Sequence, residues 1–207
     1  GGAAVSARFV INSVGGYVNP KNTVDIDGID DFTGTILRPN AWDDRYRTAG
    51  KRIAVIGTGS SGVQIAAAVA GDAATLEIYQ RTPAWVLPKV DFDIPRWLRP
   101  MMGSRWAMGA VNALGRLGMD IFMVAPLVHL LARLPSRLLI RLMPLYDAYC
   151  RGLYRLLLRA VVNDPATRRA LVPRYGILAK RPVICSGFLP ALNNPNTQLI
   201  TTSIERI

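Results

Sequence analysis

The sequence predicts an α/β fold centred on one strand–turn–helix–strand unit between residues 51 and 79. A short apolar run flanked by charge and glycine occupies residues 51–57, and a second apolar run follows at 75–79. Between them, residues 61–71 are rich in small apolar side chains and end at a glycine. Short apolar runs are typical of strands buried in a parallel sheet, and the segment between them has helical length. We therefore expect one parallel crossover with a helix between its two strands.

The composition changes along the chain, and these changes predict four segments. Residues before the central unit are rich in turn-forming pairs, whereas those after it are first rich in Leu, Met, Arg and Trp. Short apolar runs then return, and we expect strands at residues 182–185 and 198–202. The four segments are a strand end with a linker (1–50), the core unit (51–94), a helical insert (95–172), and return strands with a second linker (173–207).

The insert contains regularly placed prolines and arginines. We expect several helices separated at the prolines, which are Pro100, Pro126, Pro135 and Pro144. Arg133, Arg137 and Arg141 recur every four residues, so they share one helical face if a helix begins near Pro135. The longest charge-free stretch, Ile121–Ala132, is shorter than the roughly 20 apolar residues of a membrane span. We interpret the insert as a cover over an active site, with a basic amphipathic helix on a membrane surface as the alternative.

The charge balance points to an anionic partner. The chain has 25 Lys and Arg against 14 Asp and Glu, which gives a formal net charge of +11. Phosphates, nucleic acid or a membrane surface would suit this excess, and an acidic part of a larger protein would also balance it. We expect no nucleic-acid partner, because the aromatic residues do not alternate with basic ones in a stacking pattern. Peripheral membrane contact through residues 95–160 stays open as a second interpretation.

The cysteines and the single histidine do not form a metal or redox motif. Cys150 and Cys185 lack the spacing of either, so we expect buried thiols, no metal site and a reducing cytoplasmic location. His129 lies within an apolar stretch, where a histidine is more often packed than catalytic.

A glycine-rich turn joins the first predicted strand to the helix. Gly57 to Gly62 fits the pattern G-x-G-x-x-G. The pattern indicates dinucleotide binding more strongly here because it lies between a predicted strand and a predicted helix. Gly57 permits the tight turn, Gly59 lets the backbone approach a pyrophosphate, and Gly62 lets helix and strand pack closely. The helix N-terminus then directs free N–H groups at the phosphates, and the hydroxyls of Ser60 and Ser61 add donors. These features predict a dinucleotide site.

The residues after the second strand favour NADP over NAD. An NAD site usually carries an acidic residue there for the ribose 2′-hydroxyl. This chain has Gln80-Arg81-Thr82 instead, and Arg81 can pair with a 2′-phosphate through two hydrogen bonds. Glu77 lies earlier, in the middle of the strand, where we expect it not to reach the ribose. A solvated surface arginine is the alternative interpretation of Arg81.

A segment ahead of the glycine turn resembles a known fingerprint. Phe32, Gly34, Trp42 and Asp43 match in spacing the pattern F-x-G-x-x-x-H-x-x-x-W, followed by Pro or Asp, of Baeyer–Villiger and related flavin-containing monooxygenases. Arg38 stands at the histidine position of that pattern. Arginine keeps a large donor there but does not titrate near neutrality, which bears on Baeyer–Villiger chemistry itself.

Other segments strengthen the resemblance and imply roles for their residues. The stretch from Gly57 through Thr58 to Gln64 looks like the NADPH-binding turn of the family, and Arg81-Thr82 is similar to its 2′-phosphate segment. Gly15 resembles the glycine that ends a returning strand beside FAD. The pair Lys180-Arg181 matches a Lys-Arg pair of Baeyer–Villiger members. The resemblance implies that Lys180 assists the 2′-phosphate and that Arg181 is a catalytic residue, which stabilises negative charge near the flavin.

The resemblance therefore implies a Rossmann-like NADPH-binding domain with a helical insert, joined by its two connections to an FAD domain outside this sequence. It implies an NADPH- and oxygen-dependent flavoprotein monooxygenase that uses NADP(H) and FAD and oxidises a small apolar organic substrate with molecular oxygen. The chain by itself is expected not to turn over. The alternatives are an NADPH-dependent flavoprotein reductase, an N-hydroxylase, or a non-catalytic basic module that binds a membrane surface.

Overall fold

The computed structural model describes residues 6, 8–9, 26–89, 95–97, 99–122 and 135–207. The chain divides into two compact units. One comprises Gly1–Arg47 with Ser203–Ile207, and the other comprises Thr48–Thr202. Gly15, His129 and most of the strand expected before Gly15 lie outside the described residues.

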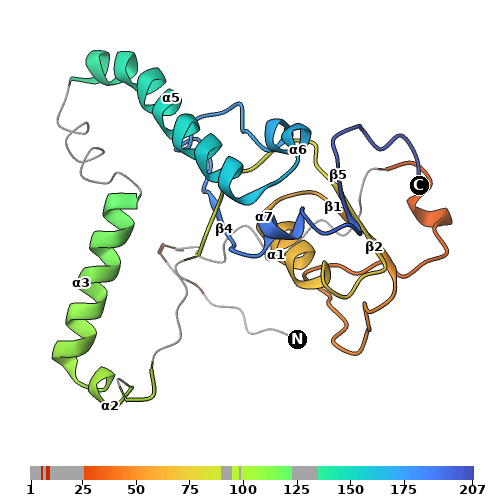
Figure 1. Cartoon of the computed structure of the whole chain (residues 1–207), viewed down its shortest axis with the longest axis horizontal. Coiled ribbons are helices and arrows are strands. Elements are labelled where there is room, and N and C mark those ends of the chain that lie inside the picture. The colour runs from red at the N-terminus through yellow and green to blue at the C-terminus, as the bar shows by residue number, and fades with distance from the viewer. Residues whose placement is uncertain (1–5, 7, 10–25, 90–94, 98, 123–134) are drawn as a thin grey trace. The chain divides into compact units, whose positions relative to one another are not determined.

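The centre of the Thr48–Thr202 unit is a parallel sheet. Its described strands are β1 (Arg52–Ile56), β2 (Thr75–Tyr79) and β5 (Thr197–Ile200), in the order β1-β2-β5 (Figure 1). Val55 of β1 pairs with Ile78 of β2, and β2 pairs with β5 on its other side. The predicted α/β class is confirmed, and both strands of the predicted central unit lie within two residues of their expected bounds.

Helix α1 (Ser60–Val69) connects β1 to β2 and carries the core contacts of the unit. Its buried side chains are small, and they belong to one core with two fully buried residues of β2, Leu76 and Ile78. Short side chains also allow α7 (Phe188–Ala191) to pack closely: a Cβ on Gly187 would lie 3.1 Å from the Cβ of Ala67. Small residues on α1 therefore set the thickness of this layer.

The end of α1 corrects one expectation. We expected Gly71 to stop the helix, but α1 ends at Val69, and Gly71 does not adopt a positive φ. The Val69 carbonyl accepts the N–H groups of Asp72 at 3.1 Å and Ala73 at 3.0 Å, and the carbonyls that follow the helix are satisfied from a distant segment. The Asn196 amide donates to the carbonyl oxygens of Ala70 at 3.0 Å and Ala73 at 2.7 Å, and the Asn194 amide donates to Ala70 at 3.3 Å. Local backbone N–H groups and distant side-chain amides together satisfy this end of α1 without a left-handed glycine.

A second, two-stranded sheet forms where two distant segments meet. Strand β3 (Val86–Leu87) pairs in parallel with β4 (Val183–Ile184), with Val86 opposite Val183. The Val183 N–H donates to the Trp85 carbonyl at 2.7 Å, and the Cys185 N–H donates to the Leu87 carbonyl at 2.9 Å. A strand was predicted from the sequence over β4 but none over β3.

The described part of the insert is helical. Its helices are α2 (Arg99–Met102), α3 (Arg105–Phe122), α5 (Ser136–Val161) and α6 (Pro165–Ala170). Pro135 is the N-cap of α5, so Arg137 and Arg141 share a face as expected, while Arg133 lies outside the described residues. The expected break at Pro144 is wrong, since α5 continues through it. A proline removes one helical hydrogen bond, and the packing of the following turns outweighs that loss here. No described helix is long and apolar enough to cross a membrane.

The second half of α5 is anchored in the core by every fourth residue. The buried side chains are Tyr146, Cys150, Tyr154 and Leu158. The Tyr154 ring packs against Trp85, with ring centroids 5.0 Å apart, and its hydroxyl accepts a hydrogen bond from the Val86 N–H at 3.3 Å. Burial raises the pKa of the Cys150 thiol, so this cysteine behaves as an apolar core residue.

Tyr154 provides a test of this packing. Burial raises the pKa of Tyr154 to about 12, from an ordinary value of 10.0, because the folded state favours the neutral phenol. The resulting stabilisation is complete below pH 10 and is lost as the pH rises towards 12, and two pKa units correspond to about 2–3 kcal/mol. Tyr154→Phe should show a shallower loss over this range. Urea unfolding at several alkaline pH values measures the effect, and parallel curves for the two proteins would contradict it.

The first unit contains the fingerprint segment. A short 3-10 helix, η1 (Ile29–Asp31), follows Gly28, and Asp31 pairs with Arg206 at 3.3 Å. The Phe32 ring lies against Gly34 so closely that a Cβ on Gly34 would overlap it. This contact explains the glycine in the fingerprint. The Nε of Arg38 is buried and has no hydrogen-bond partner among the described residues.

Candidate dinucleotide-binding site

The glycine turn has the geometry that a pyrophosphate requires. Gly57 follows β1 with φ +99° and donates its N–H to the Tyr79 carbonyl at 2.9 Å, which ties the turn to β2. Gly59 is the N-cap of α1, and a Cβ on it would meet nothing within 4 Å. A Cβ on Gly62 would overlap the Gly57 carbonyl oxygen and lie 3.0 Å from the Gly57 carbonyl carbon. The turn therefore leaves open space beside Gly59 and no room for a side chain at Gly62.

The N-terminus of α1 faces that open space without an internal partner. No side chain caps it, and its first turn carries no acidic residue. Ser60, Ser61 and Gln64 are exposed along this end of the helix. The unpaired N–H groups of a first turn, together with the helix dipole, favour an anion. The local chemistry thus fits a diphosphate.

Thr58 plays a different part from its neighbours. Its side chain is only 6% exposed, and its hydroxyl lies 3.4 Å from the Thr82 carbonyl oxygen and 3.5 Å from Oε1 of Gln80. Gln80 is 3% exposed and donates from Nε2 to the Ala170 carbonyl at 3.0 Å. These bonds join the glycine turn, the end of β2 and α6. Gln80 was not predicted as a positioning residue. A polar side chain directly after a buried strand is the sequence feature that could have indicated this role.

Arg81 follows this fixed glutamine and is exposed, as is Thr82. No carboxylate of a described residue lies within 4.0 Å of the Arg81 guanidinium. The nearest acidic residue along β2, Glu77, instead accepts a hydrogen bond from the Tyr79 hydroxyl at 2.8 Å, which raises the pKa of Tyr79. The arrangement leaves the arginine available to an external phosphate.

The Lys180-Arg181 segment precedes β4, as the Arg81 segment precedes β3. Val86 pairs with Val183 in parallel, so Lys180 and Arg81 lie in the two segments that enter this sheet from one side. The Trp85 indole donates to the Tyr175 carbonyl at 3.3 Å, and the Lys180 ammonium lies 4.9 Å above the Tyr175 ring. This cation–π contact restricts Lys180 beside Tyr175, whose carbonyl is bonded to Trp85 at the start of β3. Arg181 is exposed.

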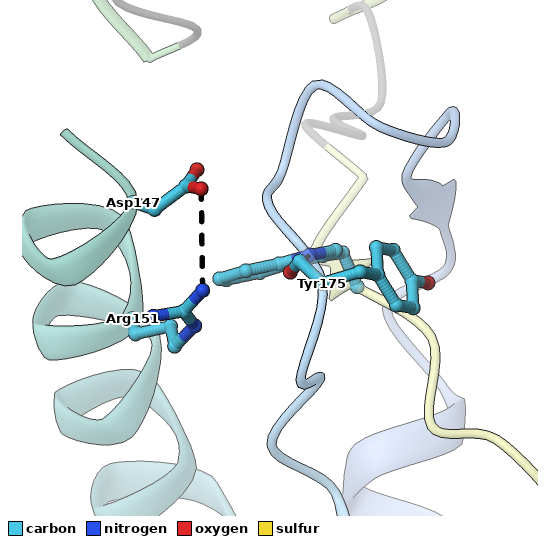
Figure 2. A network of polar contacts seen from close by, with 4 residues as sticks. Asp147, Arg151 and Tyr175 are labelled. Atoms are coloured by element: carbon cyan, nitrogen blue, oxygen red, sulfur yellow. Dashed lines mark hydrogen bonds and ion pairs between the residues drawn. The ribbon is translucent and has the colours of Figure 1, made fainter. Parts of the chain in front are cut away.

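The loop that carries Lys180 also touches α5. Figure 2 shows Asp147 and Arg151 on one face of α5 beside the segment that contains Tyr175, and the two side chains form an ion pair at 4.0 Å. A Cβ on Gly176 would overlap the present position of the Asp147 carboxylate, so the loop passes close to α5. Oδ1 of Asp147 is buried without a hydrogen-bond partner among the described residues.

The candidate residues thus form one group within the Thr48–Thr202 unit. Thr58 links the glycine turn to Gln80 and Thr82, which flank Arg81, and Lys180 contacts Tyr175, whereas Gly15 lies outside the described residues. Among the residues that the structure describes, no three His, Cys, Asp or Glu side chains gather as metal ligands.

A parallel sheet with a G-x-G-x-x-G turn at the carboxyl end of its first strand defines a Rossmann-type dinucleotide-binding domain. The model of the family described as flavin-binding monooxygenase-like matches residues 4–127, more than half of the chain. The chain belongs to the flavin-binding monooxygenase-like family, and the resemblance found in the sequence is confirmed.

Characterised relatives and solved structures agree with this assignment. The chain is 33% identical over 210 residues to a Baeyer–Villiger monooxygenase of Pseudomonas aeruginosa, covering 98% of this chain and 36% of the relative. It is 46% identical over 85 residues to cyclopentanone 1,2-monooxygenase of a Comamonas species, covering 41% of this chain and 15% of the relative. A steroid monooxygenase bound to NADP superimposes with a TM-score of 0.65 at 27% identity, over 86% of this chain and 38% of that one. The chain thus spans about two fifths of such proteins, or less.

Proposed function

We propose that the chain is the NADP(H)-binding part of a flavin-dependent monooxygenase of the Baeyer–Villiger type. The observation that carries the proposal is the glycine turn, in which Gly62 has no room for a Cβ while Gly59 opens to solvent at an uncapped helix N-terminus. The identity to a Baeyer–Villiger monooxygenase over nearly the whole chain supports the same function. In the full-length protein, incorporation of ¹⁸O from molecular oxygen into product tests it. Oxidation of NADPH without such incorporation would favour a reductase.

The residues divide the work as follows. The backbone of Gly57–Gly62 holds the diphosphate, with hydroxyl donors from Ser60 and Ser61 and with Gln64 one turn further along α1. Arg81, Thr82 and Lys180 hold the 2′-phosphate, and the bonds from Thr58 and Gln80 keep the Arg81 segment in place. Gly15 belongs to the FAD side of the protein. When bound, NADPH supplies a hydride, and FAD supplies the centre that reacts with oxygen.

Arg181 is proposed as the catalytic residue of this chain. An exposed guanidinium beside the NADP(H)-binding residues can face the flavin and stabilise negative charge that develops there, while Lys180 stays with the phosphate. The substrate is proposed to be a small apolar ketone, in line with the name of the cyclopentanone-oxidising relative. Arg38, at the fingerprint histidine position, separates this chain from the usual pattern.

A substitution at Arg181 tests this division of roles. In the full-length protein with FAD, Arg181→Ala should leave anaerobic flavin reduction by NADPH nearly unchanged, while oxygenated product falls by about 100-fold. Flavin bleaching and product formation are measured separately. Arg174→Ala, which removes another exposed arginine of the same loop, is the matched control and should affect neither. A loss of reduction with normal oxygenation per reduced flavin would contradict the role.

The peripheral membrane contact expected for residues 95–160 is also a proposal. Large apolar side chains are exposed on both long helices of the insert, among them Trp106 on α3 and Ile140 on α5, and arginines accompany them. Such a contact is compatible with catalysis by the rest of the protein.

A further inference from the structure

Four arginines surround a cavity between α5 and α6 that the dinucleotide site does not use. The cavity measures about 350 Å³, and Arg155 and Arg159 of α5 face Arg168 and Arg169 of α6 across it. Leu158, Pro165 and Val172 complete the lining. A cavity lined by both arginines and apolar residues suits an anionic group attached to an apolar body.

None of the four guanidiniums forms an ion pair within the described part of the protein, although Arg169 interacts electrostatically with Asp164. No described carboxylate lies within 4.0 Å of any of them. The acidic residue at the start of α6, Asp164, accepts hydrogen bonds from the Thr167 N–H at 2.6 Å and the Thr167 hydroxyl at 2.7 Å. These bonds hold the pKa of Asp164 below its usual range, and they engage the carboxylate at the helix cap.

An exposed apolar stripe runs along α5 beside this cavity. Leu138, Leu145, Tyr149, Leu153 and Leu156 are each between 43% and 68% exposed. At 3.6 residues per turn they fall within an arc of roughly 80°. Four arginines form a basic ridge along α5, within an arc of roughly 40° directly next to the apolar stripe. They are Arg137, Arg141, Arg155 and Arg159. Two members of this ridge, Arg155 and Arg159, also line the cavity.

We infer that this face binds an anionic phospholipid surface, with a lipid phosphate in the arginine cavity and the α5 stripe against the acyl chains. The inference rests on the peripheral membrane contact proposed above and gives that contact a site and a lipid class. A phospholipid carries its phosphate next to hydrocarbon chains, and this arrangement matches the basic ridge next to the apolar stripe of α5. A free organic phosphate would occupy the cavity alone and leave the stripe in water. An acidic peptide would likewise match the arginines but not five exposed apolar residues.

The test uses the full-length protein and sedimentation with vesicles of phosphatidylcholine alone or mixed with phosphatidylserine. Wild type should bind the mixed vesicles and release at high salt. Arg168→Gln combined with Arg169→Gln should lower the partition coefficient about 25-fold, since each arginine near an anionic surface contributes about fivefold. The matched control, Arg52→Gln with Arg174→Gln, removes the same charge away from the cavity and should lower it less than about threefold. Leu153→Gln with Leu156→Gln should weaken binding even at low salt.

Several results would overturn the inference. Equal losses in the two arginine double variants would show that net charge, not the cavity, attracts the membrane. Binding of inorganic phosphate or polyglutamate without vesicle binding would assign the cavity to a soluble anion or to an acidic protein segment. NADPH affinity is measured in every variant and should not change. If wild type binds vesicles but not NADPH, the proposed enzymatic function fails while this inference stands.

Discussion

Gly62→Ala is expected to weaken NADPH binding by more than about 100-fold and to destabilise the protein by about 1–3 kcal/mol. The added Cβ would overlap the Gly57 carbonyl oxygen, which is backbone and cannot rotate away. Helix α1 must therefore shift from the turn, and forcing such a shift in a packed unit has a cost of that size. The displaced N–H groups would lose at least two charge-assisted contacts to phosphate, each contributing about 1.5–3 kcal/mol.

Isothermal titration with NADPH and urea unfolding of the full-length protein measure the two effects. The matched control is Gly71→Ala, because Gly71 is exposed, has no positive φ, and would bring no atom within 4 Å of an added Cβ. That variant should bind NADPH normally and be slightly more stable, as alanine restricts the unfolded chain. Unchanged NADPH affinity in Gly62→Ala would mean that the dinucleotide does not rest on this turn.

Arg81→Ala is expected to weaken NADPH binding by about 10- to 150-fold and to leave NADH binding nearly unchanged. The two cofactors differ only in the 2′-phosphate, and one charge-assisted contact to it contributes about 1.5–3 kcal/mol. The anchored side chain of Gln80 keeps the neighbouring backbone in place, so the loss should be confined to that contact. Dissociation constants for both cofactors provide the measurement.

Two further variants sharpen the result. Arg81→Lys should recover part of the NADPH affinity, because an ammonium keeps the charge but not the paired hydrogen bonds of a guanidinium. Arg174→Ala removes an exposed arginine outside the candidate site and should change neither constant. Equal weakening of NADPH and NADH by Arg81→Ala would show that Arg81 acts on the shape of the site and not on the phosphate.

The central unit was predictable because its signals are local. The runs over β1 and β2 and the glycines between them follow from neighbouring residues, and the structure has them nearly as expected. The passage of α5 through Pro144 was not predictable in this way. It depends on tertiary contacts of Tyr146 and Tyr154, and packing of this kind overrides local propensity.

The candidate site likewise combines features that could be predicted from the sequence with features that could not. The glycine turn and Arg81 could be recognised from a short pattern, but the inward hydroxyl of Thr58 and the bond from Gln80 to Ala170 could not. Residues 80 and 170 are far apart in sequence, and no periodicity links them. The contact of Lys180 with the Tyr175 ring likewise depends on a loop that Trp85 fixes from another part of the chain.

The asparagine bonds at the end of α1 have a consequence for the order in which the protein assembles. The amide of Asn196 reaches carbonyls of residues 70 and 73, more than a hundred positions earlier in the chain. During synthesis these carbonyls stay exposed to water until the ribosome has made the whole insert and Asn196 behind it. Contacts between segments so far apart in sequence form slowly, so we expect this end of α1 to be completed late in folding.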